Sequence, residues 1–281
     1  MTRRIMLCRK NAQLGNRLMV YAHLLAACWE RGWEPVNPTF EEYADGFTGT
    51  LPRPHGRSYP RVRLAWELGK IAGPLSFGRI VRARARNHRH MDLQQVVEAA
   101  EAGGARTLLL QGYHFRCPAW AANQAPRLRE FFRPIDAHRL PAEAAVAALR
   151  ARAPIVVGMH IRHGDYATHM DGRFFYSIER YLGFMVRMRE LLAPSPVAFL
   201  VCSNVDIPKA QLDEFTWAPG PGAVVADLHA LSLCGYVLGP PSSFSSWSAF
   251  AGGTRLLRIE DAERPFTLAD FARQDAPETH H

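Results

Sequence analysis

Short apolar runs alternate with stretches of helical spacing between residues 155 and 259, and this alternation limits the fold more than any other feature of the chain. The apolar runs, rich in β-branched residues, are IVVGMH (155–160), VAFLVC (197–202), AVVA (223–226), YVLG (236–239) and LLRI (256–259). The stretches of helical spacing cover residues 176–192, 208–215, 227–234 and 243–251. Strands that alternate with helices form parallel sheets through right-handed crossovers, and unbroken apolar strands are buried on both faces. The sequence therefore predicts an α/β lobe with a parallel sheet flanked by helices, whose ligands bind beyond the carboxyl ends of the strands.

The first half of the chain also alternates apolar runs with stretches of helical spacing near its two ends, and it is less regular between them. It predicts strands at 5–8 and 106–113 and helices at 16–31, 118–132 and 141–150. A length of 281 residues suits two lobes, each with a core of its own. We expect a first lobe at 1–153, a second at 154–262, and a C-terminal helix and tail at 263–281. The boundary is placed where RARAP (150–154) interrupts the pattern.

Two features that the sequence lacks bear on where in the cell the protein lies. No apolar run approaches the roughly eighteen residues that a membrane-spanning helix needs. The N-terminus MTRRIMLCRK lacks the apolar stretch of a signal peptide. Five cysteines without a C-x-x-C pair predict reduced, buried thiols and neither a disulfide framework nor a zinc site. We therefore expect a cytoplasmic protein.

Seven of the eight excess positive charges lie in residues 51–100, a segment that contains GRIVRARARNHRH (78–90). The tract 78–90 contains no acid and five arginines, namely Arg79, Arg82, Arg84, Arg86 and Arg89. Such a tract attracts phosphate from nucleic acid, anionic lipid or an acidic acceptor, although a solvated loop has the same composition. No aromatic nucleic-acid motif accompanies the arginines, so we expect no nucleic-acid partner and a peripheral contact with an anionic membrane.

A second polar cluster, HIRHGDY (160–166), follows the first apolar run of the second half directly. Arg162 offers a rigid fork of donors that suits a phosphate or carboxylate. His160 lies two residues earlier and faces the same side of an extended chain. The imidazoles and carboxylates within 163–171 also allow a metal site, against which the fixed charge of the guanidinium argues. An ion-paired loop at the lobe boundary is a third interpretation.

Two expected helix starts complete the set. In GPPSSFSSWSAFAGG (239–253), three serines bring hydroxyls to a helix N-terminus, where N–H groups and the dipole favour an anion. In QLGNRL (13–18), Gly15 permits a tight turn and Asn16 can cap the helix. With Arg162 these features predict a cleft that holds a pyrophosphate without a metal. Because D-x-D and the Walker pattern are both missing, a nucleoside diphosphate sugar fits better than a triphosphate.

Four motifs, in order along most of the chain, resemble the α-1,2-fucosyltransferases of glycosyltransferase family 11, within the GDP-fucose-dependent fucosyltransferase superfamily. QLGNRLMVYAHLLA (13–26) is similar to that family's GLGNQMFQYAxxxA, LLLQGYHFRCPAW (108–120) to LxGYWQSxxYF, and HIRHGDY to HVRRGDY. DLHALSLCGYVLGPPSSFSSWSAFAGG (227–253) is similar to a segment that contains NSSFSWW. The chain departs from the pattern at His163, where HVRHG of α-1,6-fucosyltransferases also has histidine, and at Pro241 and Ser246.

The resemblance implies a GT-B-like fold of two Rossmann-like lobes with a cleft between them. It implies no metal or other cofactor, and GDP-fucose held mainly by the C-terminal lobe. Arg162 would contact the donor pyrophosphate, Asn16 would approach from the first lobe, and Asp227 would accept from guanine. The donor-binding positions carried over are Gly15, Asn16, His160, Arg162, Asp227, Ser242, Ser243, Phe244 and Ser245.

The expected reaction is inverting, metal-independent transfer of fucose to a hydroxyl of an oligosaccharide or lipid-linked glycan. The resemblance implies an α-1,2 linkage to a galactoside of a bacterial surface polysaccharide such as O-antigen. Arg162 and Asp165 are the expected catalytic residues, the latter as general base, with His169 and Asp171 as alternatives. The competing interpretations are an α-1,6-type or other linkage, and a module that binds nucleotide or an anionic surface without turnover.

Overall fold

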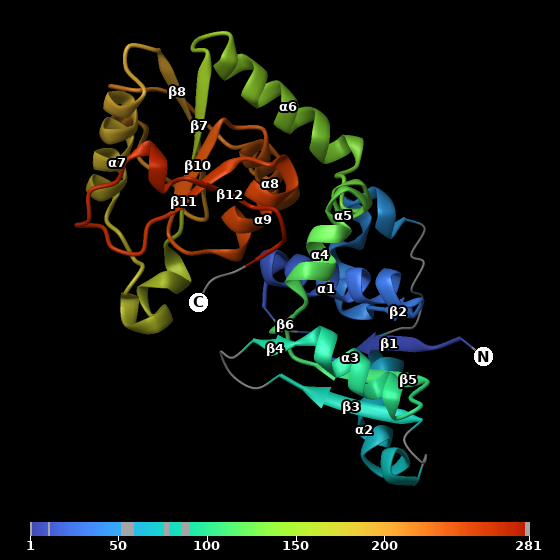
Figure 1. Cartoon of the computed structure of the whole chain (residues 1–281). Helices are drawn as coiled ribbons and strands as arrows, with labels where there is room; N and C mark the ends of the chain where they lie inside the picture. The colour runs from blue at the N-terminus through green and yellow to red at the C-terminus, as the bar shows by residue number, and fades with distance from the viewer. Residues whose placement is uncertain (1, 11, 52–58, 76–78, 86–89, 279–281) are drawn as a thin grey trace. The chain divides into compact units, whose positions relative to one another are not determined.

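The computed structural model describes the chain except residues 1, 11, 52–58, 76–78, 86–89 and 279–281 (Figure 1). It contains two compact units. The first runs to Arg133 and takes in the end of the chain from Ala276; the second spans Pro134–Asp275. The chain therefore passes between the units twice.

The first unit is built on a parallel sheet of four strands in the order β2-β1-β5-β3. Its strands are β1 (Arg4–Leu7), β2 (Glu34–Val36), β3 (Ile80–Arg84) and β5 (Thr107–Gln111). A second, two-stranded parallel pair joins β4 (Met91–Asp92) to β6 (Phe115–Arg116). The helices are α1 (Leu14–Arg31), α2 (Tyr59–Leu75), α3 (Leu93–Ala102), α4 (Pro118–Asn123) and α5 (Ala125–Phe131).

Helix α1 is the core helix of this unit. It is almost wholly buried from Leu14 to Cys28. It ends at Gly32, which adopts the left-handed conformation and donates its N–H to the carbonyl of Cys28. A residue without a Cβ takes that conformation at little cost, and so the chain can reverse into β2.

The second unit contains a six-stranded sheet in the order β12-β11-β10-β7-β8-β9. Its strands are β7 (Ile155–Ile161), β8 (Val197–Ser203), β9 (Thr216–Pro219), β10 (Tyr236–Gly239), β11 (Arg255–Arg258) and β12 (Ala272–Arg273). All pairs are parallel except β11 with β12. The helices are α6 (Asp136–Arg150), α7 (Ile178–Leu191), α8 (Val224–Ser232) and α9 (Ser243–Gly252).

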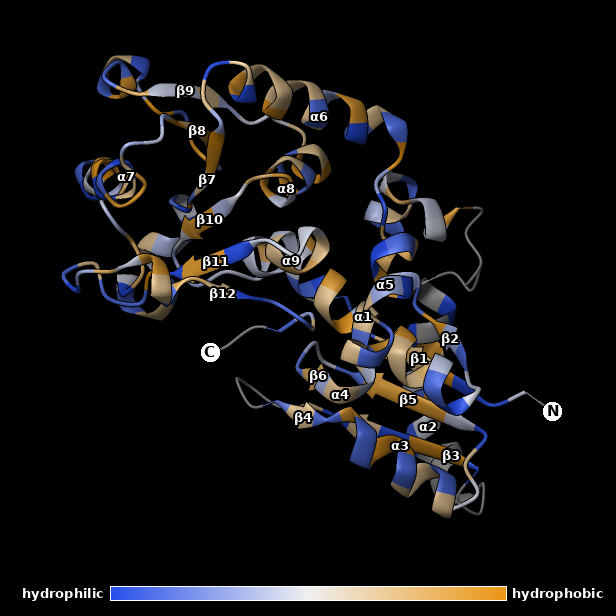
Figure 2. Ribbon diagram, turned by 45° about the horizontal axis from the view of Figure 1, so that its top comes forward, coloured by the Kyte–Doolittle hydropathy of each residue, from blue (hydrophilic) through white to orange (hydrophobic). Residues whose placement is uncertain are grey.

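Both faces of this sheet are covered. Residues of α7 pack with Val157, Met159 and Phe199 on one face. Residues of α6, α8 and α9 pack with Val156 and Leu200 on the other, and Figure 1 shows these helices on the side away from α7. The central strand β7 is accordingly buried from Val156 to Ile161, and Figure 2 shows orange, hydrophobic residues along part of it. The sequence prediction of a doubly covered parallel sheet is confirmed.

Three details differ from the sequence prediction. AVVA (223–226) begins helix α8 and is no strand; the strand is TWAP (216–219), because a short apolar run fits a buried helix as well as a strand. Helix α6 packs on the second sheet, so the division falls after Arg133 and not after residue 153. The described residues of 263–281 hold a short 3₁₀ turn and β12 in place of an α-helix.

The end of the chain is fixed to the first unit by a buried histidine of α1. The Nε2 of His23 donates to the carbonyl of Pro277 at 2.8 Å, and its Nδ1 accepts the N–H of Cys117 at 3.1 Å. Burial lowers the pKa of His23 to about 3, so the ring is neutral and can do both. One imidazole thus joins α1, the start of α4 and the C-terminal tail.

Two glycines of the second unit should respond in opposite directions to alanine substitution. A Cβ at Gly252 would lie 1.9 Å from the carbonyl oxygen of Ser232, where α9 meets the end of α8. A Cβ at Gly183, inside α7, would meet nothing within 4 Å. We expect Gly252→Ala to destabilise by about 1–3 kcal/mol and Gly183→Ala to stabilise by about 0.5–1 kcal/mol. Chemical denaturation of both variants measures this, and equal shifts would contradict the packing described.

Candidate functional site

The polar residues singled out in the second half lie at one edge of the second sheet. Arg162 follows β7, Ser242 follows β10, and Asp227 stands in the helix that follows β9. These strands run in the same direction, so their carboxyl ends share an edge. Ligands of open parallel sheets bind at that edge.

Side-chain hydrogen bonds fix the loop that follows β7. The N–H of Arg162 donates to the hydroxyl of Tyr181 at 3.4 Å. Asn204, beyond the end of β8, accepts the N–H of His163 at 2.8 Å and donates to its carbonyl at 3.0 Å. The hydroxyl of Tyr166 donates to the carbonyl of Pro241 at 2.6 Å. The loop is therefore held by α7, by β8 and by the turn that starts α9.

Arg162 is the cation at the centre of this edge. Its side chain is 18% exposed, and its Nη2 lies 2.9 Å from the Oδ2 of Asp165. Its guanidinium stands 5.6 Å from the centroid of the Tyr166 ring. The structure therefore brings the two expected catalytic residues into direct contact and holds the guanidinium between a carboxylate and an aromatic ring.

His160 is buried beside this arginine and is not a second cation. Burial, and then the charge of Arg162, lower its pKa to about 3. Its ring lies 5.2 Å from that of Phe244, and its Nδ1 has no hydrogen-bond partner among the described residues. The imidazole is neutral at physiological pH and packs against the start of α9.

The serine cluster forms the first turn of α9. Ser242 is the N-cap, and its hydroxyl accepts the N–H of Phe244 at 3.2 Å. The hydroxyl of Ser245 turns back to the carbonyl of Ser242 at 3.2 Å. Ser243 is half-buried and has no side-chain hydrogen bond among the described residues. The remaining N–H groups of a first turn have no intrahelical acceptor, and the dipole adds positive potential there.

Asp227 is positioned by a glycine-rich turn after β9. Its Oδ1 accepts the N–H of Gly222 at 2.8 Å. Partial burial raises the pKa of its carboxyl group. A Cβ at Gly220 would lie 2.6 Å from Oδ1 of Asp227 and 2.7 Å from Sγ of Cys202, so only glycine fits there. The carboxylate therefore has a fixed orientation.

The structure gives two of the family-pattern departures a physical account. His163 donates from Nε2 to the carbonyl of Tyr176 at 2.7 Å and stacks on Phe175 at 4.5 Å. Ser246 accepts from Nε of Arg258 at 3.2 Å. Both side chains therefore stabilise the framework of the site. The imidazoles and carboxylates of 163–171 do not form a group that could hold a metal ion.

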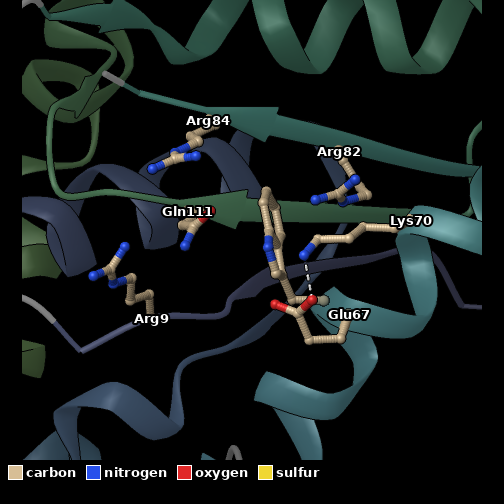
Figure 3. A pocket seen from close by; sticks show the side chains of 7 residues that line it. Arg9, Glu67, Lys70, Arg82, Arg84 and Gln111 are labelled. Carbon is tan, nitrogen blue, oxygen red and sulfur yellow. Dashed lines mark hydrogen bonds and ion pairs between the residues drawn. The ribbon is translucent and has the colours of Figure 1, made fainter. Parts of the chain in front are cut away.

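Part of the basic segment is a strand. β3 (Ile80–Arg84) pairs in parallel with β5, and Arg82 and Arg84 line a pocket of the first unit (Figure 3). Arg86 and Arg89 lie outside the described residues. The solvated-loop interpretation is therefore wrong for 80–84, where the strand pairing is regular.

The glycine turn of the first unit differs from the prediction. α1 begins at Leu14, so Gly15 and Asn16 lie within its first turn, and Gln13 is the N-cap. The chain turns earlier, at Ala12, whose φ is +57°. The prediction that Asn16 caps the helix is wrong.

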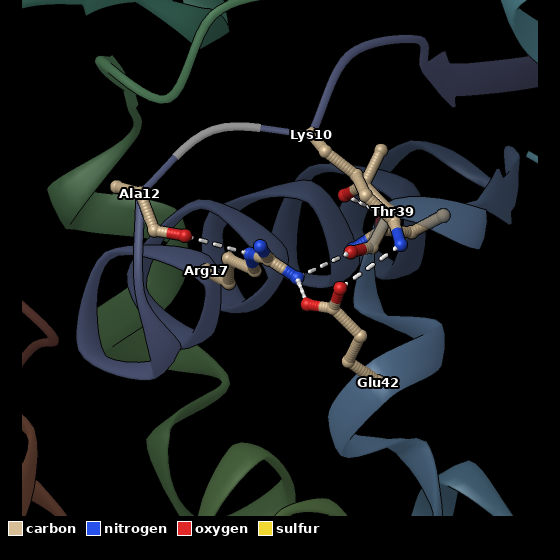
Figure 4. Close-up of polar contacts among 6 residues, drawn as sticks. Lys10, Ala12, Arg17, Thr39 and Glu42 are labelled. Carbon is tan, nitrogen blue, oxygen red and sulfur yellow. Dashed lines mark hydrogen bonds and ion pairs between the residues drawn. The ribbon is translucent and has the colours of Figure 1, made fainter.

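Arg17 fixes this helix start instead (Figure 4). Its Nε donates to the carbonyl of Ala12 at 2.9 Å, and its Nη1 donates to that of Thr39 at 3.2 Å and pairs with Glu42. Lys10 reaches the same carboxylate at 3.2 Å. Gly15 and Asn16 belong to the first unit, whereas the other donor candidates belong to the second.

Sequence reasoning missed the residues that hold the site in place. Asn204, Tyr181 and Gly220 carry no motif, since each acts through one hydrogen bond or one close approach. The available signal was positional: Asn204 follows VAFLVCS, an apolar run whose carboxyl end shares the edge with HIRHGDY.

Two kinds of feature are absent from the described residues. No group of three or more histidines, cysteines or carboxylates is arranged to hold a metal ion within that part of the chain. No helix among the same residues has both the length and the apolarity to cross a membrane.

Comparison with known proteins finds solved structures only. No family model and no curated protein matches the chain. An arginine-to-lysine mutant of FUT1 from Arabidopsis thaliana in complex with GDP has a TM-score of 0.63 at 14% identity, over 99% of this chain and 75% of that chain. NodZ α-1,6-fucosyltransferase, soaked with GDP-fucose, has a TM-score of 0.54 at 16% identity, over 97% and 98%. POFUT1 in complex with GDP gives 0.53 at 12%, over 90% and 95%.

These likenesses confirm the predicted fold class. The chain is an α/β protein with parallel sheets flanked by helices, and its structural neighbours are GT-B-like fucosyltransferases. At such low identity they establish the fold alone.

His160 makes folding sensitive to acid. Its pKa of about 3 lies below the ordinary 6.5. Between these two values the imidazole binds a proton in the unfolded chain and stays neutral in the folded chain. Stability conferred by this group is complete above pH 6.5 and is lost progressively as the pH falls toward 3. We expect His160→Gln to lose less stability than the wild type between about pH 7.5 and about pH 5 in urea unfolding. The exposed His169→Gln is the control and should lose as much stability as the wild type. If the wild type loses stability as slowly with falling pH as His160→Gln does, the assignment to His160 is refuted.

Proposed function

We propose that the protein transfers fucose from GDP-fucose to a hydroxyl of an acceptor glycan. The observation that carries the proposal is that Arg162 and the serine-capped start of α9 follow neighbouring parallel strands, at the same carboxyl edge of the second sheet. A guanidinium and a helix N-terminus together suit a pyrophosphate. The fold is shared with FUT1 and POFUT1 structures in complex with GDP, which supports GDP as the nucleotide.

The chemistry proposed is an inverting displacement without a metal. The acceptor oxygen attacks C1 of fucose from the face opposite GDP, the C1–O bond to the phosphate breaks, and GDP leaves with the bonding electrons. Negative charge grows on the leaving phosphate, where Arg162 and the α9 N–H groups can stabilise it. The neutral His160 packs behind this site and leaves Arg162 as its main cation.

Asp165 is the general base in this proposal. It is 54% exposed and lies against Arg162, so it stands where an acceptor hydroxyl and the donor phosphate would meet. Binding of the phosphate to Arg162 would loosen the ion pair and leave the carboxylate able to accept the proton of the acceptor hydroxyl. His169 and Asp171, both exposed, are the alternatives.

For the acceptor we propose an α-1,2 linkage to a galactoside of a bacterial surface polysaccharide, carried on an oligosaccharide or a lipid. Support comes from the motif resemblance to glycosyltransferase family 11. The likeness to NodZ α-1,6-fucosyltransferase favours an α-1,6-type linkage as the second candidate. A lipid-linked acceptor would bring the basic segment at 78–90 near an anionic membrane.

Arg162→Ala should weaken GDP binding by about 10- to 100-fold, because a charge-assisted pair to phosphate is lost. The same change should abolish fucose transfer, and the wild type should remain active in EDTA. Calorimetry with GDP and a transfer assay measure these effects. Arg180→Ala, an exposed arginine of α7, is the control. GDP affinity equal in the two variants would overturn the donor site, and an EDTA-sensitive activity would overturn the metal-independent chemistry.

Asp227→Asn should reduce the preference for GDP over ADP by about tenfold, because the carboxylate that would accept from guanine loses its charge. The amide keeps an oxygen for the N–H of Gly222, so the turn should stay intact. Competition binding with GDP, ADP and UDP measures the selectivity. Asp213→Asn, on an exposed turn, removes the same charge elsewhere. Unchanged selectivity in Asp227→Asn would show that guanine is read by other groups.

A further inference from the structure

A second polar pocket lies at the carboxyl end of the sheet of the first unit (Figure 3). Its volume is about 430 Å³, within the range of small-ligand sites. An adjoining pocket of about 390 Å³ shares Trp66 and Gln111 with it. None of the donor-site candidates lines either pocket.

The strand register builds one wall of this pocket. Arg84, the last residue of β3, is the register partner of Gln111, the last residue of β5. Leu7 of β1 is paired with Leu110, so Arg9 emerges just past the same edge. Figure 3 shows Gln111 between the two arginines. The guanidinium groups of Arg84 and Arg9 and the amide of Gln111 therefore lie at the carboxyl ends of three neighbouring strands, β3, β1 and β5.

Arg82 adds a positive charge that is partly buried. Arg82 lies two residues before Arg84 in the extended β3, which puts both side chains on one face. Its guanidinium stacks 4.0 Å from the centroid of buried Trp66, and its Nε is buried with no hydrogen-bond partner among the described residues. Lys70 is paired with Glu67, the only carboxylate among the lining residues. The charge of Arg82 also acts on Glu67, so four basic side chains, Arg9, Lys70, Arg82 and Arg84, outnumber the one carboxylate of this pocket.

We propose that this pocket binds an anionic group of the acceptor, either a phosphate or the carboxylate of an acidic sugar. Arginine forks recognise both groups through paired N–H donors. A recessed, half-buried Arg82 suits a group that enters the pocket more than a flat bilayer surface. Assignment of the bound group to the acceptor rests on the proposed fucosyl transfer, whereas binding of an anion in this pocket does not. The proposal gives the acceptor a chemical class, a negatively charged glycan.

The test is calorimetry of the full chain at low salt with GDP present in excess, so that the donor site is occupied. Inorganic phosphate and glucuronate are the probes, and glucose is the neutral control. We expect Arg84→Gln and Arg82→Gln to weaken binding of a charged probe by about tenfold or more. Arg79→Gln removes the same charge from the same tract outside the pocket and should bind as the wild type does. Raising the salt should weaken binding of both probes.

A change of opposite sign guards against misfolding as the explanation. Glu67→Gln removes the one carboxylate of the pocket and should tighten binding of the same probes. Phosphate without glucuronate identifies a phosphate acceptor, and the reverse identifies an acidic sugar. The proposal is overturned if neither probe binds the wild type. It is also overturned if Arg84→Gln and Arg79→Gln lose equal affinity for the probe. Binding confined to vesicles of anionic lipid, lost equally in both variants, would assign the segment to membrane contact instead. Failure of GDP to bind would reject the donor assignment and leave the pocket result intact.

Discussion

The site of the second unit depends on how the loop after β7 is held. Main-chain pairing of β7 with β8 ends at Ile161 and Ser203, and the side chain of Asn204 then continues it by two hydrogen bonds to His163. Each such bond stabilises by about 0.5–1.5 kcal/mol. Tyr166 adds a bond to the turn that starts α9. Without this support, Arg162 would lie on a free loop, and the entropy of ordering it would oppose ligand binding.

Both units use the same physical arrangement for polar groups. In each, parallel strands bring side chains to one carboxyl edge, where main-chain pairing has ended and side-chain donors can face a ligand. In the second unit a single arginine is supported by a helix N-terminus. In the first, arginines of neighbouring strands supply the charge directly. The difference suits a pyrophosphate in one case and a compact anionic group in the other.

The sequence was informative where one pattern dictates one structure. The doubly buried strand at 155–161 and the serine-rich start of α9 were predictable from apolar runs and capping chemistry alone. AVVA was misassigned because burial on all sides removes the periodicity that separates helix from strand. Asn16 was misplaced because the strain of the turn falls on Ala12, a residue with no turn preference. The role of Arg84 was not predictable, since it arises from register with a distant strand.

The histidine that fixes the tail has a consequence for how the chain can be divided. Because the first unit is completed by Pro277, it is discontinuous in sequence, and a fragment that stops at Arg133 would leave the Nε2 of His23 buried without its acceptor. A buried donor left unsatisfied costs about 1–3 kcal/mol. The first unit is therefore a two-segment domain, whose second segment is synthesised after the whole of the second unit and must then fit into a lobe synthesised before it.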